Sequence, residues 1–219
     1  MALQWAKRGS LKGTLLLTGT LGYFLYSYTS YTFLSMYNPF FLLYVFLMSA
    51  SFFAFTLSMM SFDVVRLGSA FGPKLPVKFI GGFQITIAVL LLLMWLGRIV
   101  PPLMDETVPL GLEHYTTLVI QAMDLGFIVP VAIVSGILIL KRKPFGYLLS
   151  SVMIMNSISL LTAISAMIIG QAIAGIEMSL VEVILFPVFN LVSIYCLVLL
   201  LKHVNDPGST EKQHFGKVS

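Results

Sequence analysis

Charged residues are scarce in this sequence. Only 10% of the 219 residues are Asp, Glu, Lys or Arg, whereas 58% are hydrophobic. A soluble domain needs about 25% charged residues to cover its surface. The low charge content and a mean hydropathy of +0.96 therefore exclude a soluble globular protein and indicate an integral membrane protein.

Cysteine and histidine are too few, or wrongly placed, for several kinds of membrane chemistry. The single cysteine, Cys196, lies in the last apolar run, so the sequence offers no intrachain disulfide and no redox pair. The histidines lie outside the apolar runs, which argues against haem within the membrane. The sequence also lacks HExxH, GxSxG, Walker A and CxxC motifs. We identify no catalytic residue, metal site or cofactor. An intramembrane enzyme therefore ranks behind the two interpretations given below, a carrier and a non-transporting assembly or sensor protein.

Six long apolar runs dominate the sequence. A hydrocarbon core about 30 Å thick requires roughly 20 apolar residues in a helix. Helix-start signals precede several runs, as at Asn38-Pro39, Pro76 and Pro144. We predict an all-α, polytopic membrane protein with a six-helix transmembrane domain at 1–202 and a disordered cytoplasmic tail at 203–219. The predicted spans are approximately 14–33, 39–61, 78–100, 116–140, 147–174 and 181–201.

The basic residues predict the orientation of these spans. Twelve of the 13 Lys and Arg residues precede the first run, follow the sixth, or lie in the loops after the second and fourth runs. The positive-inside rule makes that side cytoplasmic, so both termini are expected inside the cell membrane. The net charge of +4 therefore reflects topology rather than nucleic-acid binding. The expected partners are the lipid bilayer, a small solute or cation, and a membrane-protein partner or a second copy of the chain.

Asp124 is an acidic residue well inside a predicted span, with Gln121 one turn before it on the same side of the helix. A carboxylate facing lipid costs several kcal/mol, so Asp124 must face protein or water, be paired, or be protonated. The helical rise places Asp124, Asn156 and Asn190 about 12–14 Å from the nearest end of their predicted spans. We therefore predict a polar layer near the midplane, with Asp124, Gln121, Asn156 and Asn190 as a ligand or proton site.

Three further features of the sequence carry structural predictions. Arg98, near the outer end of the third span, can reach outward to Asp105 or Glu113, or inward to Asp124. We predict an outward ion pair, with Arg98–Glu113 as the candidate. Pro130 lacks an N–H group and is expected to kink the fourth span and free the carbonyl of Gly126. The aromatic cluster at 23–41 is expected to form an interfacial belt.

Two functional interpretations remain open from the sequence. The first is a small carrier or permease-type subunit that uses the midplane polar layer as its site. The alternative is a non-transporting assembly or sensor protein whose polar residues only fix helix packing.

Overall fold

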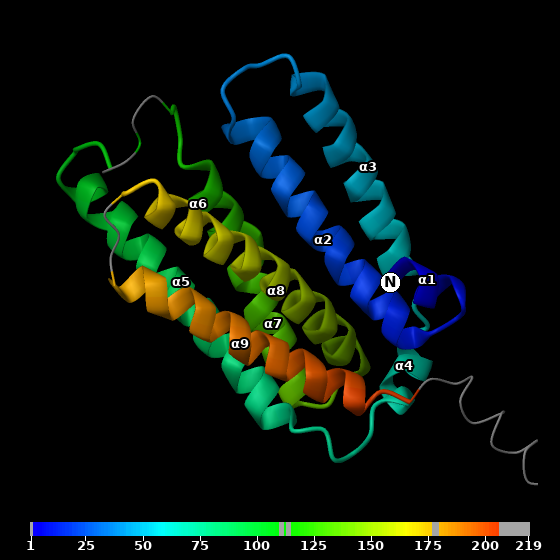
Figure 1. Cartoon of the computed structure of the whole chain (residues 1–219). Helices are drawn as coiled ribbons and strands as arrows, with labels where there is room; N and C mark the ends of the chain where they lie inside the picture. Colours follow the sequence, from blue (N-terminus) through cyan, green and yellow to red (C-terminus); the bar gives the residue numbers. More distant parts are fainter. Residues whose placement is uncertain (1, 110–111, 113–114, 177–179, 206–219) are drawn as a thin grey trace, which may run out of the picture.

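The computed structural model describes residues 2–109, 112, 115–176 and 180–205 of the chain. Helices account for most of these residues, and the described part contains a single isolated β-bridge, between Phe71 and Val204 (Figure 1). The elements are α1 (Ala2–Lys7), α2 (Leu11–Leu34), α3 (Phe41–Met60), α4 (Val64–Ala70), α5 (Val77–Met104), α6 (Val119–Met123), the π-helical turn η1 (Asp124–Ile128), α7 (Val129–Leu140), α8 (Pro144–Ile173) and α9 (Leu180–Lys202).

Five helical stretches within the described ranges are long and apolar enough to cross a membrane. They are Phe41–Met60, Val77–Met104, Val119–Leu140, Pro144–Ile173 and Val183–Lys202. These stretches match the second to sixth predicted spans and make the chain a multi-pass membrane protein. The first predicted span, 14–33, lies within α2, which has 24 residues but is not among the five because Tyr, Ser and Thr occupy much of it.

The hydroxyl groups of α2 are largely satisfied by α2 itself. Six Ser and Thr side chains donate to the carbonyl oxygen four residues earlier, at 2.7–3.1 Å; they are Thr14, Thr18, Thr20, Thr29, Ser30 and Thr32. A hydroxyl group that bonds its own backbone loses much less on leaving water than an unpaired one. The polar composition of α2 is therefore compatible with burial among other helices.

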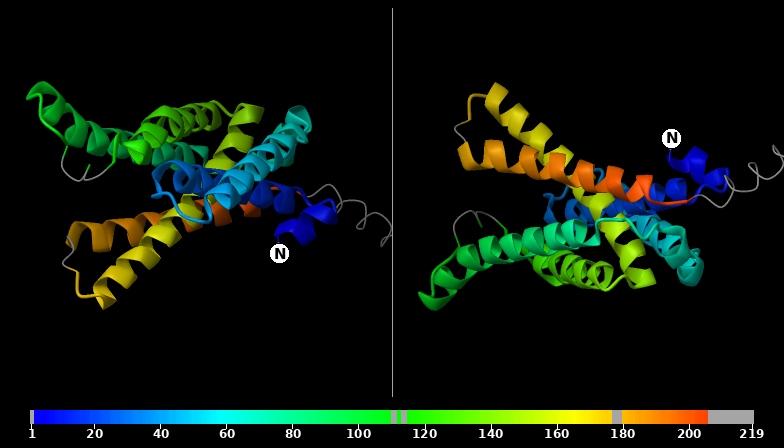
Figure 2. Two further views of the ribbon diagram at one scale, coloured as in Figure 1. Left: turned by 90° about the horizontal axis from the view of Figure 1, so that it is seen from above. Right: turned by 90° about the horizontal axis from the view of Figure 1, so that it is seen from below.

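α8 occupies the centre of the assembly. It packs against α2, α7 and α9, while α3 packs on α2 and α5 packs on α7. Views from above and below show that α5 and the α8–α9 pair diverge towards one end (Figure 2). The main core lies towards the other end.

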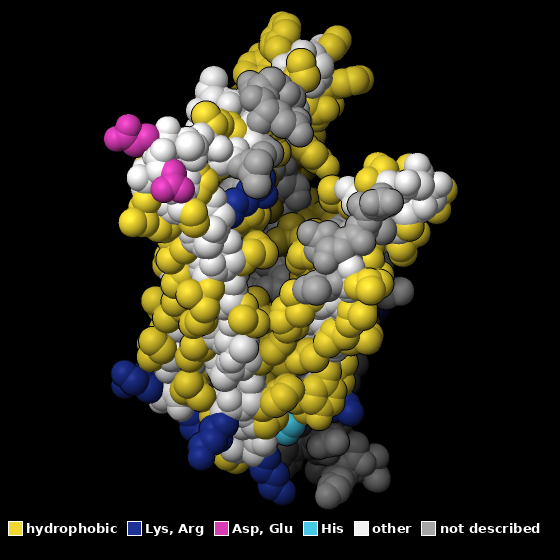
Figure 3. Space-filling model, turned by 90° about the vertical axis from the view of Figure 1, so that its left-hand side faces the viewer, with side chains coloured by type: hydrophobic (Ala, Val, Ile, Leu, Met, Phe, Trp, Pro, Cys, Tyr) yellow, Lys and Arg dark blue, Asp and Glu magenta, His cyan; other side chains and the backbone are white. Residues whose placement is uncertain are grey.

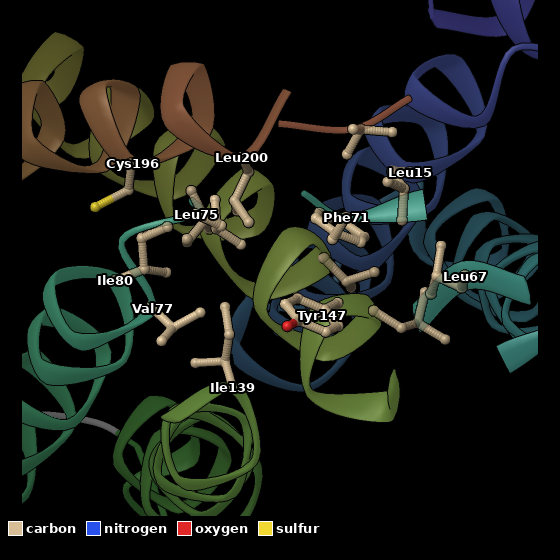
Figure 4. Close-up of a cluster of buried hydrophobic side chains, with 14 residues drawn as sticks. Leu15, Leu67, Phe71, Leu75, Val77, Ile80, Ile139, Tyr147, Cys196 and Leu200 are labelled. Atoms are coloured by element: carbon tan, nitrogen blue, oxygen red, sulfur yellow. The ribbon is translucent and has the colours of Figure 1, made fainter. Parts of the chain in front are cut away.

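The main hydrophobic core lies at the end where the described chain begins and ends (Figures 1 and 4). Leu15, Ile80, Ile139 and Leu200, from four different helices, are at most 1% exposed. The rings of Phe71 and Tyr147 stack there with their centroids 4.6 Å apart. Between membrane-spanning helices, close packing of such side chains, rather than their removal from water, stabilises the contact.

The chain beyond α9 joins this core. The N–H of Gly72 donates to the carbonyl of His203, and the N–H of Asn205 donates to the carbonyl of Ala70, both at 2.9 Å. Residues 203–205, which the sequence places in a disordered tail, are thus part of the folded structure. The rest of the predicted tail, 206–219, lies outside the described residues.

Charge is distributed unevenly along the assembly. Figure 3 shows Lys and Arg side chains gathered at the core end and Asp and Glu side chains at the opposite end, with one Lys or Arg group near the acidic end. We call these the basic end and the acidic end. Both ends of the described chain lie at the basic end (Figure 1).

Candidate functional site

Asp124 connects three helical segments. It is the first residue of η1 and is 6% exposed. The Tyr26 hydroxyl of α2 donates to Oδ1 of Asp124 at 2.8 Å, and Nε1 of Trp95 on α5 donates to Oδ2 at 2.9 Å. Each carboxylate oxygen therefore accepts a hydrogen bond from a different neighbouring helix.

The two donors differ in what they can do next. An indole N–H only donates, so Oδ2 must remain an acceptor while Trp95 is in place. A phenol hydroxyl can donate or accept, so Tyr26 can reverse its role by rotating its O–H bond. Both donors can stabilise an ionised carboxylate, because hydrogen bonds to a charged acceptor are strong. A proton arriving at Oδ1 would turn Tyr26 into an acceptor without moving Trp95.

Asp124 lies at an irregular point in the helix. The N–H of Val129 donates to the carbonyl of Asp124, five residues back, which is the pattern of a π-helical turn. Pro130 explains the widening, because its ring clashes with the carbonyl one turn earlier. The sequence predicted an irregularity here but described it as a proline kink. π-turns of this kind frequently occur at functional sites.

Asp124 also lies closer to the start of its helical stretch than the sequence predicted. α6 begins at Val119 rather than near residue 116, so Asp124 is only five residues into the helical stretch. This corresponds to about 7.5 Å along the axis. Gln121, one turn before Asp124, is 8% exposed and therefore lies in the interior.

The two asparagines of the predicted layer lie at different heights. Asn156 on α8 is 6% exposed. Asn190 on α9 donates from Nδ2 to the Thr162 hydroxyl at 3.0 Å, which places Asn190 level with Thr162. Thr162 is six residues beyond Asn156, or about 9 Å along α8. Within the described part of the chain, Oδ1 of each asparagine is buried without a hydrogen-bond partner, and no hydrogen bond joins either amide, or Gln121, to Asp124.

The predicted ion pair cannot be placed. Arg98 is exposed on α5, three residues after Trp95, so it lies one turn nearer the acidic end on the same face of the helix. Glu113 lies outside the described residues. The Arg98–Glu113 pair therefore stays a prediction.

Sequence reasoning missed both partners of Asp124. Tyr26 falls inside the aromatic cluster that was assigned to an interfacial belt, and Trp95 falls inside an apolar run. A signal for Trp95 does exist, because an indole N–H within the membrane needs an acceptor. Asp124 is a carboxylate acceptor in the next predicted span.

A second polar cluster, also missed, lies nearer the basic end. The Ser150 hydroxyl of α8 donates to Oε1 of Gln84 on α5 at 2.9 Å, and Nε2 of Gln84 donates to the Ser150 carbonyl at 3.4 Å. Ser150 is 0% exposed and Gln84 is 6% exposed. These groups are uncharged and satisfy one another, so this cluster is a contact between helices rather than a ligand site.

Comparisons with known proteins assign no family. No protein-family model matches the chain, and neither the curated proteins nor the solved structures include a significant match. Within the ranges that the structure describes, no three His, Cys, Asp or Glu side chains are grouped to hold a metal ion. A functional proposal must therefore be based on the chemistry of Asp124 and its two hydrogen-bond partners.

Proposed function

We propose that this protein is a small carrier or permease-type subunit of the cell membrane in which Asp124 takes up and releases a proton. One observation carries the proposal: a buried carboxylate on a π-helical turn of a membrane-spanning stretch, held by Tyr26 and Trp95. Ionisable groups within spans are costly, and they usually mark ion or proton pathways.

The hydrogen bonds favour a proton over a metal cation. A cation at Oδ2 would meet the donor-only indole N–H of Trp95, which cannot turn a lone pair towards it. A proton at Oδ1 requires only rotation of the Tyr26 hydroxyl. The Oδ1 side, next to Tyr26, is thus the position where Asp124 exchanges its proton.

The shape of the acidic end supports access to this site. The surface there is hollowed between two projecting parts (Figure 3), and the ends of α5 and of the α8–α9 pair diverge (Figure 2). Asp124 lies about 7.5 Å from the start of its helical stretch. Water would reach Asp124 by a shorter path from the acidic end than from the basic end.

The proposed topology has six spans, with α2 as the first and both termini in the cytoplasm. α2 is 24 residues long, or about 36 Å, which suffices to cross a bilayer. Both described chain ends lie at the basic end, which the positive-inside rule assigns to the cytoplasm. The acidic end, and the opening towards Asp124, would then face outward.

A second candidate is a non-transporting assembly or sensor protein. The observation that favours it is the pairing of interior polar groups across helices, as in Asn190 with Thr162 and Ser150 with Gln84. Under this alternative Asp124 only joins α2, α5 and η1, and the partner would be another membrane protein or a second copy.

The variant Asp124→Asn separates the two candidates. Its amide carbonyl can accept from Trp95 while its NH₂ donates to the Tyr26 oxygen, so the packing survives and only the titrating group is lost. Under the proposal, the thermal stability of the wild type changes between about pH 5 and pH 8, and this change is reduced in Asp124→Asn. The control Asp105→Asn removes an exposed carboxylate outside the site and should behave like the wild type. Identical pH profiles for wild type and Asp124→Asn would favour the packing role.

A further inference from the structure

The N-terminal elbow, residues 2–12, folds back tightly on the first turn of α2. The N–H groups of Arg8 and Ser10 both donate to the carbonyl of Trp5, and Gly9 has a φ of +76°, which suits glycine. Ser10 then caps α2 by accepting from the N–H of Gly13 at 3.3 Å. These contacts hold α1 in a fixed position beside the start of α2.

Gly13 shows how close this contact is. A Cβ added at Gly13 would lie 2.5 Å from the Ala6 nitrogen and 2.6 Å from the Trp5 Cβ. Real side chains essentially never approach backbone so closely, so only glycine allows α1 to reach this position. The position of α1 against α2 is therefore fixed by specific contacts.

The elbow presents apolar and basic groups side by side. Leu3 is 52% exposed and Trp5 is 45% exposed, and the exposed Lys7 and Arg8 follow at once. The elbow lies at the basic end, where α2 begins (Figure 1). In a membrane this level is the interface, where tryptophan is favoured and where Lys and Arg meet the lipid phosphates.

We propose that the N-terminal elbow binds anionic phospholipid headgroups, with Trp5 at the headgroup level and Lys7 and Arg8 against the phosphates. Charge complementarity selects this partner, because two exposed cations beside a half-exposed indole suit a negatively charged bilayer surface. The inference goes beyond the proposed function and does not depend on Asp124.

The test uses the fact that the chain has only two tryptophans, Trp5 and Trp95. The protein is reconstituted into vesicles that mix zwitterionic and anionic phospholipids, with bromine quenchers on the acyl chains of one lipid at a time. The difference in fluorescence between the wild type and Trp5→Phe reports Trp5 alone. We expect brominated anionic lipid to quench Trp5 more strongly than brominated zwitterionic lipid at equal mole fraction.

Two double variants with the same loss of charge locate the interaction. Lys7→Gln with Arg8→Gln should abolish the preference for anionic lipid, because each basic residue contributes roughly a fivefold enrichment. Lys141→Gln with Lys143→Gln removes two exposed charges elsewhere at the basic end and should retain the preference. Equal quenching by both lipids in the wild type, or equal losses in the two double variants, would overturn the proposal. So would loss of the preference on adding inorganic phosphate at constant ionic strength, since a soluble anion would then be the ligand.

Discussion

Gly81 of α5 and Gly136 of α7 face each other across a contact that has no room for a side chain. A Cβ added at Gly81 would lie 2.8 Å from the carbonyl oxygen of Gly136, and one added at Gly136 would lie 2.9 Å from the carbonyl oxygen of Gly81. Membrane helices gain packing energy from such close approach, since lipid provides no hydrophobic drive for their association. This contact holds α5 against α7 next to the main core, which includes Ile80 and Ile139.

The variant Gly136→Ala is expected to separate α5 from α7. The added methyl would also meet Ile85 at 2.6 Å, so the helices must shift, at a cost of about 1–3 kcal/mol. The apparent unfolding temperature of the purified protein should fall. Gly82→Ala is the matched control, because a Cβ at Gly82 meets nothing within 4 Å. Alanine is a better helix former than glycine, so this control should be neutral or slightly stabilising.

Removal of the Ser150 hydroxyl should loosen the contact between α5 and α8. Ser150→Ala leaves Oε1 of the buried Gln84 without its donor, and we expect a loss of about 1–2 kcal/mol in unfolding free energy. Ser151→Ala is the comparison, because the Ser151 hydroxyl is equally buried but donates to the Tyr147 carbonyl of its own helix. Thermal unfolding should rank Ser150→Ala below Ser151→Ala. The opposite order would mean that the Gln84 contact contributes little.

Most of the helical architecture follows from the apolar runs. A backbone that crosses lipid must satisfy its own hydrogen bonds, so each run of about 20 apolar residues becomes one helix. The predicted spans 39–61 and 147–174 accordingly agree closely with α3, Phe41–Met60, and α8, Pro144–Ile173. α2 shows the limit of predicting spans from hydropathy. A hydropathy scale counts each Ser and Thr as polar, although in α2 their hydroxyl groups donate to carbonyl oxygens of the same helix.

The interior position of Asp124 was predictable, but its environment was not. The cost of exposing a carboxylate to lipid requires burial wherever the helix packs. Its partners depend on which helices become neighbours. The indole N–H of Trp95 signals the need for an acceptor within the membrane, but no local pattern shows which acceptor it meets. Tyr26 is 98 residues away in sequence and Trp95 is 29 residues away. The height difference between Asn156 and Asn190 likewise arises from the register of α8 against α9, which only the Asn190–Thr162 contact reveals.

Cysteine labelling in intact cells tests the proposed topology, including α2 as the first span. Tyr37→Cys and Thr107→Cys place exposed thiols beyond α2 and α5, and a membrane-impermeant maleimide should label both from outside. Gln4→Cys and Ser69→Cys lie at the basic end and should react only after the membrane is opened. The native Cys196 is 0% exposed, so the parent protein serves as the unlabelled control. External labelling at both Gln4→Cys and Tyr37→Cys would mean that α2 does not cross the membrane.

A double-mutant cycle tests whether the Trp95 hydrogen bond depends on the charge of Asp124. Trp95→Phe keeps an aromatic ring but removes the donor to Oδ2, which leaves one oxygen of a buried carboxylate unpaired. We expect this change to cost about 1.5–3 kcal/mol with Asp124 present, since hydrogen bonds to charged groups lie in that range.

The same change should cost less in the Asp124→Asn background, because the indole then bonds only a neutral amide. The difference between the two losses is the coupling free energy, which should reach about 0.5–3 kcal/mol for groups in direct contact. A second cycle with Tyr26→Phe provides the comparison at Oδ1. In Asp124→Asn the new NH₂ group can donate to the Tyr26 oxygen, so the hydrogen bond at this position survives with its direction reversed. Additive losses in the Trp95 cycle would show that Asp124 is held as a neutral group, and proton release from this site would then be untenable.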